Sequence, residues 1–196
     1  MPDVLLKIKL LSHWSAGSGR SRGADADELV IKDKYGLPYL PGRTVKGLLR
    51  EAMQTCEDAG QVPEGTTHYL FGTPSIQGNP AGSKPGMLQF RNATLPAEEK
   101  NYLKNKVHSV DNNLIDAMYD IISFTKLDDE GIAQDKTLRT IELTIPLELE
   151  TKISWKGPAA DPNWISYLQK ACTLLRGLGA HRNRGFGRCL VTIQKG

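Results

Sequence analysis

The order of strand-like and helix-like segments constrains the fold of this chain more than any other feature of its sequence. Apolar residues recur with helical spacing over residues 45–56 and 164–175, and this spacing is typical of amphipathic helices that bury one face. Strand-like apolar runs occupy residues 4–11, 87–95, 137–155 and 189–194. The resulting order, β–α–β–β–α–β, predicts an α+β fold of the ferredoxin-like type.

Local signals mark the starts of both helices and the extent of two insertions. Thr44 is the expected N-cap of the first helix, and Asp161 with Pro162 supplies an N-cap and an N1 proline for the second. The 196 residues are expected to form a single domain, residues 1–196. An irregular insertion is predicted at residues 58–86, and a polar, partly helical one at 96–136 that includes a hairpin tip at 128–131.

Composition favours a reduced, cytoplasmic protein with no membrane partner. No apolar run approaches the roughly 20 residues that span a bilayer, and the N-terminal residues enter the first strand-like run without a secretory signal. The cysteines Cys56, Cys172 and Cys189 are widely spaced and form no CxxC pair, which argues against a zinc site.

Positive charge is concentrated in two segments although the net charge is only +3. The first, PGRTVKGLLR at residues 41–50, begins the first helix, where free backbone N–H groups and the helix dipole favour an anion. It lacks the GxxxxGK[ST] order of a phosphate-binding P-loop, and the glycines at 17, 19 and 23 do not form GxGxxG. The segment therefore fits either local phosphate contacts or a capped helix with solvated basic residues.

The second basic segment, GLGAHRNRGFGR at residues 177–188, combines features that suit a phosphate chain. Glycines permit close approach of a ligand to the backbone, arginines can bind phosphates with two hydrogen bonds, and Phe186 can stack on a base. A plain connector between a helix and a strand needs one or two glycines and no arginine, so a binding function is favoured here.

Three segments together resemble the RAMP superfamily of CRISPR effector proteins, above all the repeating backbone subunit of type III (Csm and Cmr) complexes. They are the first strand with the Gly-Ser-Gly loop at 17–19, LPYLPGRTVKGLLR at 37–50, and the closing segment 177–188. YLFG at 69–72 and DKTLRTIE at 135–142 are weaker matches. The resemblance implies an RRM-like palm whose sheet type reads single strands, a thumb-like hairpin around residues 124–139, and a role in antiviral defence.

The implied partners are a guide RNA, a target RNA, other effector subunits and further copies of the chain, which would stack along the guide while the hairpin displaces a base at regular intervals. The residues expected to contact RNA lie in the first helix, the hairpin and the closing segment. They are Arg43, Thr44, Lys46, Arg50, Arg139, Gly179, Arg182, Arg184, Gly185, Phe186, Gly187 and Arg188.

Cleaving members of this family carry an aspartate between the first strand and the first helix, where Asp27 aligns best and Asp25 is the second choice. The resemblance therefore implies a metal-dependent endoribonuclease, in which Asp27 holds Mg²⁺ or Mn²⁺ or positions a ribose 2′-OH for attack on the adjacent phosphate. Such relatives often have a histidine where this chain has Ser15, and His13 lies further back. His181 is expected to contact RNA or solvent.

Two other functions remain open within the same superfamily. One is a non-catalytic terminal or capping subunit, and the other is a metal-independent ribonuclease that processes the guide. Cleavage of repeat RNA by the isolated protein in EDTA distinguishes the second.

Overall fold

The computed structural model describes residues 3–19, 21, 26–73, 83–106, 113–126, 128–134, 136–157 and 160–195. Its main sheet, the palm, has the order β2-β4-β7-β1-β8, with β3 also pairing with β7. These strands are β1 (Asp3–Leu10), β2 (Tyr39–Leu40), β3 (Leu88–Phe90), β4 (Ala93–Thr94), β7 (Glu148–Trp155) and β8 (Cys189–Lys195).

The predicted ferredoxin-like fold is confirmed by the order and direction of the palm strands. β3 and β4 together are the second strand of the pattern, interrupted at residues 91–92. β7 lies beside them and beside β1, and β8 pairs with the other edge of β1, all antiparallel. The four strands thus stand in the spatial order second, third, first, fourth, with both long crossovers made by helices.

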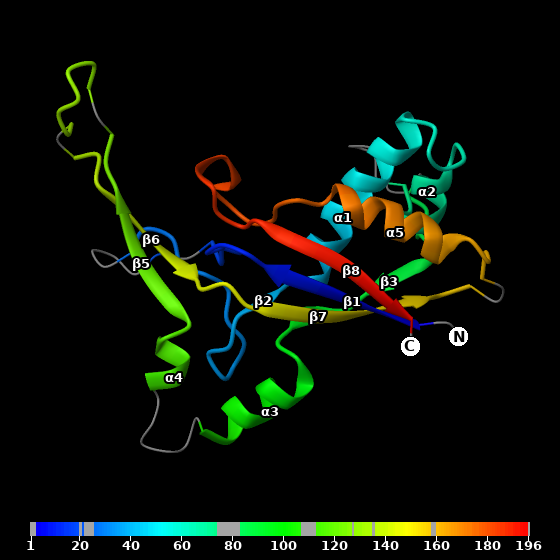
Figure 1. Cartoon of the computed structure of the whole chain (residues 1–196), viewed down its shortest axis with the longest axis horizontal. Helices are drawn as coiled ribbons and strands as arrows, with labels where there is room; N and C mark the ends of the chain where they lie inside the picture. The colour runs from blue at the N-terminus through cyan, green and yellow to red at the C-terminus, as the bar shows by residue number, and fades with distance from the viewer. Residues whose placement is uncertain are drawn as a thin grey trace.

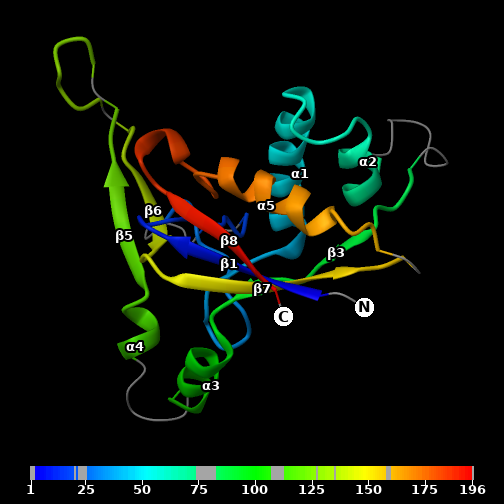
Figure 2. The same ribbon diagram turned by 45° about the vertical axis from the view of Figure 1, so that its right-hand side comes forward.

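Both long helices, α1 (Gly42–Asp58) and α5 (Trp164–Leu174), cover the same face of the palm (Figures 1 and 2). Alternation along β1 explains this arrangement, because Val4, Leu6, Ile8 and Leu10 are buried while the residues between them are not. The buried side chains of the strands and of both helices form one hydrophobic cluster. Trp155 and Trp164 pack within it with their ring centroids 5.9 Å apart.

The start of each helix differs from its prediction. Thr44 is not the N-cap of α1, because the helix begins at Gly42 and the Thr44 N–H donates to the carbonyl of Pro41. The Gly42 N–H instead donates to Oδ1 of Asn92, 2.9 Å away. In α5 the N-cap position is Asn163 rather than Asp161, whose carboxylate accepts from the Asn163 N–H in a turn that precedes the helix.

The insertion at 58–86 is not wholly irregular, since α2 (Thr66–Phe71) lies within it. The carboxylate of Glu57, at the end of α1, accepts from the N–H groups of Gly65 (2.8 Å) and Thr67 (2.7 Å). Burial opposes the charge on Glu57, but these hydrogen bonds outweigh it and hold the pKa of the carboxyl below its usual value.

The second insertion contains two helices and a separate hairpin. The helices are α3 (Ala97–Lys106) and α4 (Asn113–Asp116), and the hairpin, here called the thumb, consists of β5 (Tyr119–Phe124) and β6 (Arg139–Thr144). The thumb projects away from the palm (Figure 1). The predicted extended run 137–155 is therefore two strands in two sheets, divided at residues 145–147.

The three cysteines are buried and unpaired. Burial raises the pKa of Cys172 to about 12 and that of Cys189 to about 11, so both act as small apolar side chains. Within the described ranges, no helix has the length and apolar character that a membrane crossing requires.

Candidate nucleic-acid interface

Asp27 lies at the root of the thumb, in the extended stretch 26–32, here called the Asp27 segment, which runs beside β6. Its N–H donates to the carbonyl of Thr140 (2.7 Å), and its Oδ2 accepts from the Thr140 N–H (2.8 Å). The next bond between the two segments runs from the Glu142 N–H to the carbonyl of Glu28 (2.9 Å). The Asp27 side chain is exposed, and its Oδ1 has no hydrogen bond to any described residue.

A hollow of about 460 Å³ adjoins Asp27 and is lined also by Gly17, Gly19, Ser21, Glu28 and Leu29. Asp25, the second candidate, lies outside the described residues. Within the described part of the chain, His, Cys, Asp and Glu side chains nowhere gather in threes as a protein-only metal site requires. Mg²⁺ commonly uses one or two carboxylates and completes its shell with water and substrate phosphates, so Asp27 fits a cation that RNA helps to bind.

His181 brings the closing segment against the same place, a position that its sequence context did not predict. Its Nε2 lies 3.1 Å from Oε2 of Glu28, the neighbour of Asp27. Its ring stacks on Phe124 at the end of β5, with centroids 6.4 Å apart. The backbone of His181 has φ 58°, a left-handed conformation that costs energy in a residue with a Cβ. These contacts join the Asp27 segment, the thumb and the closing segment.

Phe124 is the centre of an aromatic cluster at the thumb root. Phe186 meets its ring edge-on at 6.1 Å, and the guanidinium of Arg184 lies over it at 5.0 Å. Phe186 was predicted to stack on a base, and the structure places it in this cluster, beside two arginine-lined clefts. An edge-to-face pair and a cation over a ring each stabilise the arrangement.

The first cleft, here called the thumb cleft, has a volume of about 490 Å³ and lies between the thumb and the closing segment. Its lining comprises Phe124, Thr125, Lys126, Lys136, Thr137, Arg139 and Arg184. Four of these side chains are cationic and none is acidic, so the cleft favours an anion such as a phosphodiester. Arg139 and Arg184 are sequence-predicted RNA contacts that the fold brings together.

Lys126 and Lys136 were missed by sequence reasoning, although the hairpin pattern contains a signal for them. Phe124 pairs with Arg139 in the ladder, and the Lys126 N–H donates to Oγ1 of Thr137. Continuing the register beyond the last ladder pair therefore places Lys126 opposite Thr137, the neighbour of Lys136, so the two lysines lie near one another.

The second cleft, of about 620 Å³, lies between α1 and the closing segment. Its polar lining includes Arg176, Arg182, Asn183, Arg188 and a single acid, Glu51. Arg182 and Arg188 were predicted RNA contacts and share this cleft. Arg43, Lys46 and Arg50 lie on α1 but line neither cleft, and Asn92 already occupies the first N–H of the helix.

Two of the predicted RNA-binding glycines are required by the protein itself. A Cβ on Gly179 would overlap the carbonyl oxygen of Ser15, and one on Gly187 would overlap that of Leu178. The Gly187 N–H also donates to the carbonyl of His13 (2.7 Å). Gly185 differs from both, because its φ of 85° needs glycine but no protein atom lies within 4 Å of the Cβ position. Among these glycines, only Gly185 leaves space for a ligand.

The palm face opposite the helices lacks the aromatic platform of an RRM sheet. On β1, β7 and β8 that face carries aliphatic, polar and charged side chains. Lys7 is paired with Glu150 at 3.0 Å and with Glu148 at 3.3 Å. The described aromatic cluster lies at the thumb root instead, next to the cationic thumb cleft.

Comparisons with known proteins bear on these features. The sequence model of the RAMP superfamily matches residues 7–190, whereas no curated protein sequence matches the chain. Among solved structures, a chain from the cryo-EM structure of the type III-B Cmr-beta complex bound to cognate target RNA is 12% identical, covering 97% of this chain and 96% of that chain, with a TM-score of 0.68. A chain from the apo state of Cmr-beta is 13% identical with the same coverage and a TM-score of 0.69. These structures share the fold, and the family match extends over most of the sequence: the chain belongs to the RAMP superfamily.

Proposed function

We propose that this protein is a backbone subunit of a type III CRISPR effector complex. In this proposal it binds the guide RNA and cleaves the paired target RNA, with Asp27 as the catalytic residue. The carrying observation is the position of Asp27 at the thumb root, where its Oδ1 accepts no hydrogen bond from any described residue. Membership of the superfamily and the fold shared with chains of Cmr-beta support the proposal.

In this proposal the two clefts hold RNA through its backbone. The arginines and lysines that line them neutralise phosphates independently of sequence. RNA in the thumb cleft would lie next to the cluster that His181 joins to the Asp27 segment. Phe124 and the thumb stem then separate neighbouring bases, while the backbone is held on both sides.

The chemistry assigned to Asp27 is the orientation of a ribose 2′-OH. Its Oδ1 would accept a hydrogen bond from the hydroxyl and take its proton as the oxygen attacks the adjacent phosphorus, while Thr140 fixes the carboxylate through Oδ2. The bond from phosphorus to the 5′ oxygen would break, and that oxygen would leave as a hydroxyl after taking a proton from water, which leaves a 2′,3′-cyclic phosphate. Asp27 is also the residue that would hold a divalent cation, and such a cation would supply charge neutralisation at the phosphate. The cationic side chains of the thumb cleft add to that neutralisation.

Two Asp27 variants in the reconstituted complex test the assignment. Asp27→Asn keeps an oxygen that accepts from the Thr140 N–H but loses the charge, whereas Asp27→Ala loses both. We expect both variants to bind guide and target like the wild type, and both to lose cleavage by about 100-fold or more. Cleavage by Asp27→Asn at the wild-type rate contradicts a catalytic role.

The hydrogen bond from Thr140 to Asp27 also favours a second candidate, a non-catalytic subunit in which Asp27 only fastens the thumb. In that case, Asp27→Ala lowers the free energy of unfolding while Asp27→Asn does not, and no subunit-dependent cleavage of target RNA occurs. Denaturant melts of both variants beside the cleavage assay separate the two functions.

A further inference from the structure

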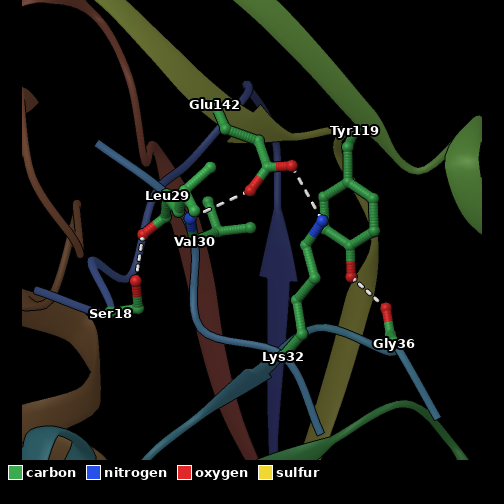
Figure 3. A network of polar contacts seen from close by, with 7 residues as sticks. All are labelled: Ser18, Leu29, Val30, Lys32, Gly36, Tyr119 and Glu142. Atoms are coloured by element: carbon green, nitrogen blue, oxygen red, sulfur yellow. Dashed lines mark hydrogen bonds and ion pairs between the residues drawn. The ribbon is translucent and has the colours of Figure 1, made fainter. Parts of the chain in front are cut away.

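Glu142 on β6 is the one charged residue that is buried within the described part of the chain. It lies two residues beyond Thr140, which bonds Asp27. Figure 3 shows its surroundings. Its Oε1 accepts from Nζ of Lys32 at 2.7 Å, and its Oε2 accepts from the N–H of Val30 at 3.1 Å. One thumb side chain therefore contacts both backbone and side chain of the segment that follows Asp27.

Tyr119, on the other thumb strand, completes the network. The Lys32 ammonium lies 3.6 Å from the centre of the Tyr119 ring, and the Tyr119 hydroxyl donates to the carbonyl of Gly36 at 2.6 Å. Burial, reinforced by the nearby carboxylates, raises the pKa of Tyr119, so the phenol remains a neutral donor. Lys32 is thus held by an anion from β6 and an aromatic face from β5.

The Glu142 side chain is 6% exposed, whereas that of Lys32 is 29% exposed. Such a pair contributes little net stability, because desolvation offsets the attraction between the charges. It does favour one arrangement, because any other arrangement leaves the buried Glu142 carboxylate without a cationic partner. A shift of one residue between β6 and the Asp27 segment would bring Ile141 or Leu143 to the place of Glu142 and turn side chains to the opposite face. Lys32 would then lose its carboxylate.

We propose that the Lys32–Glu142 pair is a positioning device for Asp27, which fixes the register between the Asp27 segment and the thumb. The inference rests on the proposed cleavage function, and it assigns Lys32 and Glu142 no contact with RNA. The same register carries the bonds from Asp27 to Thr140, so a change in the pair alters where the catalytic carboxylate stands.

The decisive variant is the double substitution Lys32→Met with Glu142→Leu, which replaces the pair by apolar groups of similar size. Removing the two charges also removes their desolvation cost, which offsets the loss of an acceptor for the buried Val30 N–H, so the thermal midpoint is expected to stay within a few degrees of the wild type. The matched control makes the same changes in the palm pair Lys7 and Glu150, whose side chains are 27% and 21% exposed, as Lys7→Met with Glu150→Leu. Lys32→Arg, which retains the charge, is the conservative variant.

Single-turnover cleavage and target binding are measured for each protein in the reconstituted complex. For Lys32→Met with Glu142→Leu we expect cleavage to fall by about tenfold or more, with the Kd for target changed by no more than about twofold. The control variant and Lys32→Arg should keep most of the wild-type rate. Hydrogen exchange, which needs no activity, should show weaker protection of the amides at 27–30 in the double variant, with β1 and β7 unchanged.

Each other result overturns the inference. An unchanged cleavage rate with unchanged amide protection shows that the pair sets no register. A loss of cleavage that follows the thermal midpoint or target binding shows a general structural role instead. A wild-type complex that does not cleave overturns the proposed function itself, and that result is distinguishable because it appears before any variant is compared.

Discussion

At the residue scale, the glycines of the closing segment show that one residue type serves two purposes within a few positions. Gly179 and Gly187 stand where other backbone passes too closely for a Cβ, whereas Gly185 stands in open space with a left-handed backbone. Sequence alone predicted all three as places of close approach. It did not distinguish approach by RNA from approach by the chain's own carbonyls, because that depends on how the segment folds back on Leu178 and how Ser15 packs against it.

Alanine substitutions distinguish these purposes. Gly185→Ala incurs only the left-handed backbone cost and should lower the free energy of unfolding by about 1–2 kcal/mol. Gly179→Ala adds overlap with the Ser15 carbonyl and should cost about 3 kcal/mol or more. Denaturant unfolding of the two variants measures the difference, and equal costs would mean that the contact with Ser15 relaxes freely.

At the element scale, the parts of the fold that follow a local period were predictable and the parts set by distant partners were not. Alternation identified β1 and β8, and helical spacing identified α1 and α5. The cap of α1 comes from Asn92, 50 residues away, so Thr44 carried a misleading local signal. The division of 137–155 was not predicted, because both halves alternate, although Pro146 at the break cannot donate a ladder hydrogen bond and is a local signal for it.

The start of α2 provides a pH-dependent test of a cap from another helix, because the Glu57 carboxylate at the end of α1 accepts from the N–H groups of Gly65 and Thr67. The folded pKa of Glu57 lies below its unfolded value, so its contribution to stability is complete above the unfolded pKa and is lost as pH falls through the folded pKa. Glu57→Gln should therefore lower the free energy of unfolding by about 1 kcal/mol at neutral pH, and this deficit should shrink below about pH 4. Urea melts at several pH values measure it, and a deficit independent of pH contradicts the assigned hydrogen bonds.

At the scale of the whole molecule, the palm and the thumb root divide the charges between them. Opposite charges pair on the open face of the palm, whereas cations without acids line the thumb cleft. The described chain thus combines a sheet face on which most charges are paired with a cationic junction, a contrast that the net charge of +3 conceals. RNA is expected at the junction, where phosphates meet unopposed cations.

The salt dependence of guide binding tests this division. Each cation that contacts a phosphate of single-stranded RNA contributes about −0.7 to the slope of log K against log salt concentration. Lys126→Ala and Lys136→Ala should each weaken guide binding with little dependence on sequence and make the slope shallower by about that amount. Lys9→Ala is the matched control, because Lys9 is an exposed lysine on β1 that points away from the helices. Fluorescence titrations over a range of salt concentrations give the slopes, and a slope that changes for Lys9→Ala but not for the thumb lysines would place the RNA on the palm sheet.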